Sequence, residues 1–221
     1  MPDDYDDISR LIRESWSNDD PAGWFEPLYA GAAQGQARVP WARRIPNPAL
    51  VQWAERVRLD GSGQRAAVIG CGLGDDAEYL AGRGFAVTAF DIAPTAVEWC
   101  RQRFPDSAVH YRVADLFDLP PEWARAFDFV LEINTVQALP YTISDAAMAH
   151  IAGMVKPGGS LLVVCDGREP QQTRRGIPWP ISIAELAAFE RGGLQTVTFD
   201  DFLSDRGVRR FRVHYRRPRS E

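Results

Sequence analysis

The sequence has little of what marks several large classes of protein. Its three cysteines, Cys71, Cys100 and Cys165, show no CxxC spacing, and its three histidines are scattered, so we predict neither a disulfide framework nor a metal site. No apolar run approaches the roughly 20 residues of a membrane span. The N-terminal MPDDYDDISR is acidic and lacks the apolar core of a secretory signal. We therefore expect reduced, mostly buried thiols in a cytoplasmic protein.

Excess positive charge is also missing. The 25 basic and 30 acidic residues give a net charge of −5, which argues against nucleic-acid binding and against a membrane-surface role. The chain has 221 residues, of which 45% are hydrophobic, enough for one globular domain with a sizeable core. We expect a monomer by default, acting on a small molecule.

The middle of the chain alternates short β-like runs with helical patterns. The runs lie at 66–70, 86–90, 108–113, 126–133 and 159–165, and the helical patterns at 75–84, 94–104 and 144–155. Pro94 suits the first turn of its helix, Ser144 can cap the next one, and KPGG at 156–159 ends it. This alternation predicts an α/β fold, a Rossmann-like doubly wound sheet with right-handed crossovers and helices on both faces.

The two ends differ from this core. The first 60 residues read as helices around a proline-rich segment at 37–48. After residue 166 come a proline-rich loop, a helix with a capping box of Ser182 and Glu185, and two strands at 194–203 and 208–217. Strands joined without a long crossover are antiparallel. We therefore predict a mixed seven-stranded sheet whose last strand is antiparallel, in one domain of three parts: 1–60, 66–165 and 166–221.

The stretch AAVIGCGLGDDAEYL carries the first chemical signal. Gly70, Gly72 and Gly74 follow the first strand and allow a tight turn beneath a ligand, but the third glycine comes one place early for a nicotinamide fingerprint. Asp75 stands where a pyrophosphate would lie, and two such charges about 4 Å apart repel by about 4 kcal/mol at an effective dielectric constant of 20. Asp75 and Asp76 also suit helix capping. A ligand with a ribose and positive charge, such as S-adenosylmethionine, fits this loop better.

Two further carboxylates follow later strands. Asp91 ends the second strand, where it can accept both ribose hydroxyls, or serve only as a turn residue. Asp115 follows the third strand, where it can accept the adenine amino group with Leu116 or Phe117 on the ring face, or serve only as a loop cap. Dehydrogenases do not need this last element.

The motifs VIGCGLGDD, FDIAP, VADLFD, FDFVLEI and VKPGG, in this order from Val68 to Gly159, resemble those of class I S-adenosylmethionine-dependent methyltransferases. Within that class, WFEPLY…VPWARRIPNPAL, FDFVLEINTVQAL and IPWPISIAEL are similar to the thiopurine and thiol/halide methyltransferase branch. The resemblance implies a methyltransferase domain over 1–221, with 1–60 as a lid over the cofactor and 166–221 as substrate loop and β-hairpin. It implies that the cofactor, S-adenosylmethionine, is bound by Trp24, Trp41, Gly70, Cys71, Gly72, Gly74, Asp91, Ile92, Asp115, Leu116, Glu132 and Ile133.

The acceptor side is less well marked. By resemblance Trp179 walls the acceptor pocket, although core packing is the plain alternative for all three tryptophans. The chain departs from the branch in carrying Asn134 and Gln137 where relatives have a threonine and aromatic residues, which predicts a more polar pocket. Glu132 and Asp166 are the only carboxylates we nominate as a base. Since no histidine ends a strand, we predict a soft acceptor such as a thiol.

Three alternatives stay open. The first is an O- or N-methyltransferase that orients its acceptor with Asn134 and Gln137. The second is a nicotinamide-dependent oxidoreductase, and the third is a non-catalytic cofactor-binding protein. The arginine-rich run from Arg206 to Arg219 could bind an acidic substrate, although a solvated strand face is the simpler interpretation.

Overall fold

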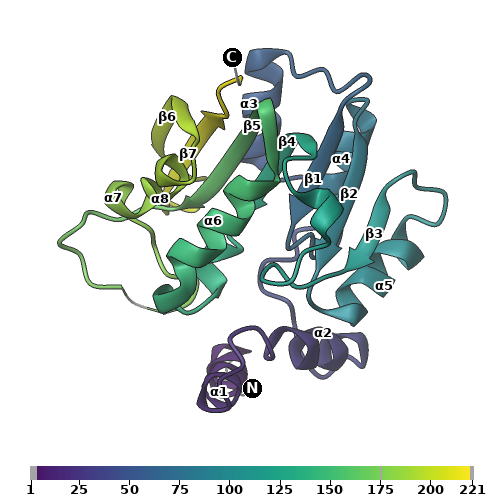
Figure 1. The fold of residues 1–221 in the computed structure, drawn as a ribbon. Coiled ribbons are helices and arrows are strands. Elements are labelled where there is room, and N and C mark those ends of the chain that lie inside the picture. The colour runs from purple at the N-terminus through teal and green to yellow at the C-terminus, as the bar shows by residue number, and fades with distance from the viewer. Residues whose placement is uncertain (1–3, 175, 220–221) are drawn as a thin grey trace.

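The structure is a computed structural model that describes residues 4–174 and 176–219 (Figure 1). The N-terminal region forms three helices, and the rest alternates strands with helices before ending in two adjacent strands. The helices are α1 (Asp4–Ser17), α2 (Phe25–Ala33), α3 (Pro48–Val57), α4 (Asp75–Gly82), α5 (Pro94–Arg103), α6 (Ser144–Met154), α7 (Ile183–Leu186) and α8 (Ala188–Arg191), with short 3₁₀ turns η1 (Pro121–Trp123), η2 (Val136–Ala138) and η3 (Tyr141–Ile143). The strands are β1 (Arg65–Ile69), β2 (Ala86–Asp91), β3 (His110–Val113), β4 (Phe127–Ile133), β5 (Val155–Asp166), β6 (Gln195–Leu203) and β7 (Arg209–Arg216).

The seven strands form one mixed sheet in the order β3-β2-β1-β4-β5-β7-β6. The first five are parallel, and β7 is antiparallel to both β5 and β6. The predicted fold is therefore confirmed. Because β7 runs against β5, its first residues lie at the carboxyl edge of the parallel strands, where Arg210 pairs with Asp166.

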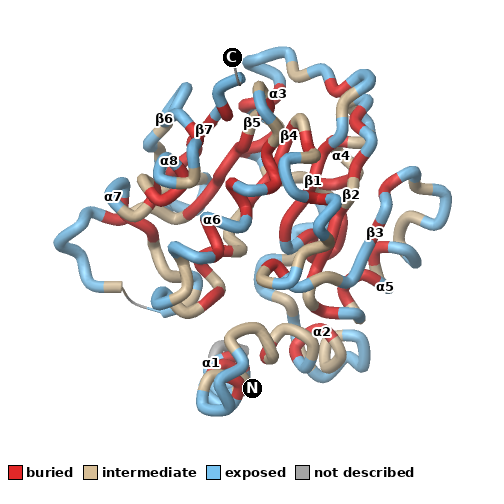
Figure 2. The backbone as a smooth tube through the Cα atoms, viewed as in Figure 1, coloured by how far each residue is buried: buried red, intermediate tan, exposed pale blue. Residues whose placement is uncertain are grey.

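Alternate residues of each strand face two different layers. Ala66 and Val68 of β1 pack with residues of α3, α4 and α5, whereas Ala67 and Ile69 pack with residues of α6 and α8. Figure 2 shows the buried residues concentrated along the central strands, with exposed residues on the outer helices. The helices on both faces bury the central strands β1, β4 and β5, as the near-continuous apolar runs of β4 and β5 require.

One local prediction is wrong. Ser144 is the first residue of α6 and makes no cap, because Ile143 occupies the N-cap position behind the turn η3. Helix α6 ends at Met154, just before KPGG, and this segment already lies within β5, where the pairing with β4 is irregular between Phe127 and Phe129. Pro94 does open α5, and Ser182 and Glu185 form a capping box as predicted.

The two aspartates at the start of α4 do not cap their own helix. Gly74 is the N-cap, with a φ of 87° that favours glycine. Asp75 instead forms an ion pair with Arg103 of α5 at 2.8 Å, and Asp76 accepts a hydrogen bond from the backbone N–H of Asn47 at 2.6 Å. Arg103 offsets the charge that the sequence argument placed against a phosphate, so repulsion by Asp75 is weaker than predicted.

The charged face of β7 is only partly solvated, because Arg216 is exposed whereas Arg212 is not. Arg212 is buried and donates to Asp200 of β6 at 2.8 Å and to the carbonyl oxygen of Ala49 at 2.9 Å. Arg217 is also buried and donates to the carbonyl oxygens of Ala152 and Val155. These guanidinium groups tie the last strands to the helical layers.

Helices α1 and α2 lie together at one end of the sheet (Figure 1). Their buried face includes Ile8, Ile12 and Leu28, which pack with Ala138 after β4 and Ile177 of the loop after β5. The N-terminal helices therefore cover the carboxyl edge of the central strands. None of the helices within 4–174 and 176–219 is long and apolar enough to cross a membrane.

Candidate functional site

The glycine loop after β1 is shaped by its neighbours. Gly70 and Gly72 have φ values of 57° and 54°, and a Cβ on Gly70 would lie 2.4 Å from Oγ1 of Thr135. That hydroxyl donates to the carbonyl oxygen of Ile69 at 3.1 Å. The backbone N–H of Cys71, whose side chain is buried in the core, donates to Phe90 of β2 at 2.9 Å. The loop is thus fixed against both adjacent strands.

Asp91 holds the loop from the end of β2. Its side chain is 5% exposed and accepts hydrogen bonds from the backbone N–H groups of Gly72 at 2.9 Å and Ala93 at 3.0 Å. Burial raises the pKa of the carboxyl group, and these backbone donors lower it. Each carboxylate oxygen can accept more than one hydrogen bond, so this aspartate can act both as a turn residue and as a ribose acceptor.

A pocket of about 190 Å³ opens beside Ile92, the residue that follows Asp91. The core contributes Ile92, Asp115 and Phe117, the residues just after β2 and β3, and the N-terminal region closes the other side. Leu116 points instead into the core, so of the two residues considered for the ring face it is Phe117 that lines the pocket. Asp115 is exposed and accepts from the backbone N–H of Phe117 at 2.8 Å. The N-terminal wall consists of Asp20, Pro21, Ala22, Gly23 and Glu26.

Glu132 near the end of β4 is 1% exposed. Its Oε1 accepts from the backbone N–H groups of Thr135 at 2.7 Å and Val136 at 3.1 Å, whereas its Oε2 is buried and has no hydrogen-bond partner among the described residues. Burial raises the pKa of this carboxyl group to about 7, although the two backbone donors and the charge of Arg210 lower it. Ile133, the next residue, packs against the core cluster on the opposite face.

Three strand ends meet beside Glu132. Arg210 at the start of β7 forms an ion pair with Asp166 at 2.8 Å and donates to Oδ1 of Asn134 at 3.0 Å. Asn134 has a φ of 63°, a conformation that asparagine tolerates better than most residues. Burial raises the pKa of Asp166 and the guanidinium lowers it. Two carboxylates and one guanidinium thus stand at this edge.

Comparison with known proteins agrees with this geometry. Residues 67–163 match the model of a family described as a methyltransferase domain. The ubiquinone biosynthesis O-methyltransferase of Xanthomonas axonopodis pv. citri is 34% identical over 126 residues, which are 56% of this chain and 52% of that protein. The protein of the same name from Pseudomonas syringae pv. tomato is 33% identical over 127 residues, 57% of this chain and 53% of the relative. The chain spans about half the length of these relatives.

The segment 67–163 is thus similar to a methyltransferase domain. The class predicted from the five motifs is confirmed for this segment, but the thiopurine and thiol/halide branch is not, because the curated relatives above carry a different name.

Solved methyltransferases share the fold of the domain. The 1,6-didemethyltoxoflavin-N1-methyltransferase of Burkholderia thailandensis, solved with S-adenosylhomocysteine, has a TM-score of 0.66 at 15% identity, covering 97% of this chain and 90% of that one. The N-methyltransferase NodS of Bradyrhizobium japonicum WM9, also solved with S-adenosylhomocysteine, has a TM-score of 0.67 at 20% identity, covering 86% and 98%. These likenesses extend the shared fold beyond the matched domain to most of the chain.

Gln137 makes several hydrogen bonds with the loop after β5. Its amide group donates to the carbonyl oxygen of Trp179 at 2.8 Å and accepts from the backbone N–H of Asp166 at 2.8 Å. The backbone carbonyl oxygen of Gln137 accepts a hydrogen bond from the backbone N–H of Trp179 at 2.8 Å. The side chain therefore holds the loop after β5 in place. Direct contact of Gln137 with an acceptor stays a prediction.

The predicted tryptophans lie in aromatic clusters near the edge. Trp24 is 1% exposed and stacks on Phe25 with 3.9 Å between ring centroids, and its indole N–H has no partner among the described residues. Trp41 is 42% exposed and donates to the phenolic oxygen of Tyr29 at 3.0 Å. These rings pack between the N-terminal helices and the core, so contact with a cofactor stays a prediction for both.

The sequence analysis missed Tyr29 and Glu26 and named Arg210 only within the arginine-rich run. Tyr29 is buried over Gly72, and Glu26 binds the backbone N–H and hydroxyl of Thr95 at 3.0 and 2.6 Å. Arg210 reaches the edge only because β7 is antiparallel to β5. The last could have been found by pairing the two strands, but the first two depend on how α2 docks. In the part of the chain that the structure describes, no three His, Cys, Asp or Glu residues gather as metal ligands.

Proposed function

We propose that this protein transfers a methyl group from S-adenosylmethionine to a small-molecule acceptor. The observation that carries this proposal is the buried Oε2 of Glu132, which has no donor among the described residues. A buried carboxylate oxygen without a donor is costly, by about 1–3 kcal/mol or more for a charged group. The ammonium group of a methionine portion would supply that donor.

The other residues at the edge suit the remaining parts of this cofactor. Asp91 would accept the ribose hydroxyls, Asp115 would accept the adenine amino group, and Ile92 and Phe117 would pack on the adenine ring. The pocket of about 190 Å³, which Ile92, Asp115 and Phe117 line opposite the N-terminal wall, supports the placement of the adenine. When bound, the cofactor would supply an activated methyl group on a sulfonium. The chain's own residues then have to bind the cofactor and the acceptor, orient them toward each other and exclude water.

Positioning carries most of this chemistry. Holding two reactants in line can supply about 7–11 kcal/mol of the barrier. The helices α1 and α2 cover the edge and would exclude water from it. Glu132, whose pKa burial raises to about 7, or Asp166 would take the proton that the acceptor loses.

We propose a hydroxyl oxygen as the methyl acceptor. The thiol prediction depended on the absence of a base, and the raised pKa of Glu132 weakens that argument. The relatives from Xanthomonas and Pseudomonas are named O-methyltransferases. A thiol is the second candidate. No histidine is among the hydrogen-bond partners of Glu132 and Asp166. A thiol ionises near pH 8.5 and therefore needs little assistance from a base.

Two measurements test the function. Calorimetry should show binding of S-adenosylhomocysteine and none of NADH; the reverse result would mean a nicotinamide-dependent oxidoreductase. Formation of S-adenosylhomocysteine is then followed with catechol and with benzenethiol as acceptors. Turnover of catechol alone supports the hydroxyl, and turnover of benzenethiol alone supports the second candidate. Cofactor binding without turnover on any acceptor, N-nucleophiles such as aniline included, would mean a non-catalytic binding protein.

A further inference from the structure

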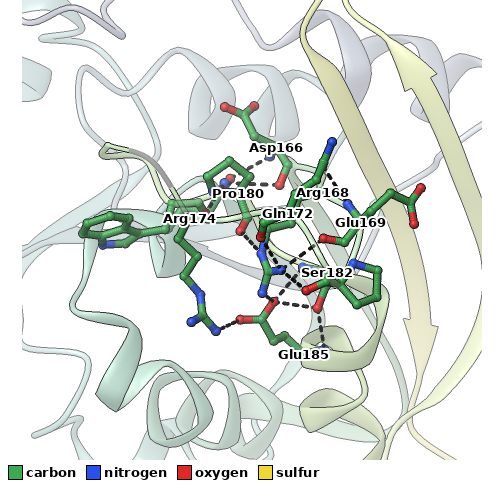
Figure 3. A network of polar contacts seen from close by, with 11 residues as sticks. Asp166, Arg168, Glu169, Gln172, Arg174, Pro180, Ser182 and Glu185 are labelled. Atoms are coloured by element: carbon green, nitrogen blue, oxygen red, sulfur yellow. Dashed lines mark hydrogen bonds and ion pairs between the residues drawn. The ribbon is translucent and has the colours of Figure 1, made fainter.

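The loop between β5 and α7 is held by one buried guanidinium. The side chain of Arg168 is 8% exposed, and its Nε donates to the carbonyl oxygen of Pro180 at 3.0 Å (Figure 3). Its Nη1 donates to the carbonyl oxygens of Glu169, Pro170 and Gln172 at 3.0–3.1 Å. Most of the hydrogen-bonding capacity of Arg168 is therefore used to shape the loop.

Glu185 of α7 receives two arginines. Its Oε2 accepts from Arg168 at 2.6 Å and from the backbone N–H and hydroxyl of Ser182 at 2.8 and 2.6 Å. Its Oε1 accepts from Arg174, whose side chain is 35% exposed. Figure 3 shows Arg168 and Arg174 approaching this one carboxylate. Because Glu185 keeps Arg168 and Ser182, Arg174 can leave it without stranding a charge.

Arg174 also lies against a wall of three aromatic side chains, Trp16, Tyr141 and Trp179, which we call the aromatic wall. Its guanidinium lies 4.8 Å from the ring centroid of Tyr141. Trp179 is stacked on Trp16 with 6.0 Å between centroids and meets Tyr141 edge-on at 6.4 Å. The wall combines residues of α1, η3 and the loop, and its indole N–H at Trp179 has no partner among the described residues.

The aromatic wall is tied to the end of β5. Gln137 binds the backbone of Trp179 through two hydrogen bonds of 2.8 Å and the backbone N–H of Asp166 through a third. A molecule lying on the wall would therefore lie near the strand end that carries Asp166. It would also meet Arg174, whose departure leaves the other hydrogen bonds of the loop in place.

We propose that the methyl acceptor is a planar aromatic compound with an acidic substituent, whose ring packs on the aromatic wall and whose acid group binds Arg174. This inference rests on the proposed function. Aromatic side chains favour flat π-systems, and a guanidinium matches the two oxygens of a carboxylate. Such a compound would bind Arg174 through its acid group and lie near the strand end that carries Asp166.

The test is calorimetry on protein saturated with S-adenosylhomocysteine. The probes are 3,4-dihydroxybenzoate, catechol, which lacks the acid group, and cyclohexanecarboxylate, which lacks the ring. We expect dihydroxybenzoate to bind about tenfold more tightly than catechol, through the charge-assisted pair with Arg174, and about tenfold more tightly than cyclohexanecarboxylate, through its aromatic ring. R174Q should abolish its advantage over catechol and leave catechol unchanged. W179A should weaken both aromatic probes, and W179F should restore part of the loss.

R56Q is the matched control, because Arg56 forms an exposed ion pair with Asp200 outside this loop. It should leave all three affinities unchanged. Three results would each overturn the inference. Dihydroxybenzoate and catechol could bind with equal affinity, dihydroxybenzoate could still bind more tightly than catechol to R174Q, or dihydroxybenzoate could fail to bind. The binding of S-adenosylhomocysteine is measured first. Its failure overturns the proposed function, whereas its success followed by one of those results overturns only the acceptor class.

Discussion

The carboxylate of Asp91 accepts a hydrogen bond from the backbone N–H of Gly72 at 2.9 Å, across 19 positions of the sequence. Its other oxygen accepts from Ala93 at 3.0 Å. One buried side chain thus fixes the glycine loop after β1 and the turn into α5 at the same time. A residue that we propose as a cofactor ligand also shapes the loop beneath that cofactor.

D91N should therefore weaken both the fold and the binding of the cofactor. The amide has one accepting oxygen, so its NH₂ group would face one of the two backbone N–H groups. We expect the free energy of unfolding to fall by about 1–3 kcal/mol, and the Kd of S-adenosylhomocysteine to rise by about 10- to 100-fold. Calorimetry and urea unfolding measure the two. D60N, at an exposed turn carboxylate, is the control, and equal Kd values for D91N and wild type would refute the assignment.

The close approach of Gly70 to Thr135 gives a second prediction. G70A would place a Cβ 2.4 Å from the threonine hydroxyl in a backbone conformation with φ 57°. G63A has a similar φ of 72° but nothing within 4 Å of its Cβ. We expect G63A to cost about 1 kcal/mol for the left-handed conformation alone, and G70A to cost at least about 2 kcal/mol more through overpacking. Urea unfolding of both variants checks this, and equal losses would show that the threonine yields without cost.

The fold was predictable because its signals are local and repeated. Alternation of apolar runs with helical patterns between residues 66 and 165 indicates a parallel sheet. Two adjacent strands at the end require an antiparallel pair. The errors lie where packing overrides a local signal. Serine is a common N-cap residue, but α6 follows the turn η3 directly, so Ile143 takes the N-cap position and Ser144 is already the first residue of the helix.

The site was predictable where a residue follows directly from a strand end. Asp91, Asp115 and Glu132 each follow or end a strand, so their meeting at one edge is a consequence of the parallel sheet. Glu26 was missed, and Arg210 was named only within the arginine-rich run, because their places depend on how a helix docks and on which strand pairs with which. Gln137 shows a further limit, because a polar residue near a site gives no sign of whether it faces a ligand or a backbone.

The contact of Glu26 with Thr95 predicts how the N-terminal helices hold the cofactor. The carboxylate binds the backbone N–H and the hydroxyl of Thr95 and forms part of the pocket wall. E26A should loosen α2 from α5 and raise the dissociation rate of S-adenosylhomocysteine by about tenfold, the equivalent of one charge-assisted hydrogen bond of about 1.4 kcal/mol. Stopped-flow displacement measures the rate. E98A removes an exposed carboxylate of α5 and should leave the dissociation rate unchanged. Equal dissociation rates for E26A and E98A would contradict the role of Glu26.

The buried carboxyl group of Glu132 predicts a pH dependence of stability. Its pKa is raised from 4.5 to about 7 by burial, so between these values the folded protein holds a proton that the unfolded chain has lost. The free energy of unfolding should therefore decrease as the pH rises through this window, by up to about 3 kcal/mol at 1.36 kcal/mol per pKa unit. E132Q cannot ionise and should lose this part of the slope. Urea unfolding at several pH values between 4.5 and 7.5 measures it.

D76N separates this effect from that of the other buried carboxyl group. The pKa of Asp76 is raised from 3.8 to about 6, so its contribution ends below that of Glu132. Between pH 6 and 7 we expect D76N to follow the wild type and E132Q to be flatter. S-adenosylhomocysteine should reverse the trend in the wild type, because an ammonium beside Glu132 favours its ionised form and so binds more tightly as the pH rises through 7. Parallel stability curves for E132Q and the wild type would mean that the pKa of Glu132 is not raised, and this support for its proton-accepting role would be lost.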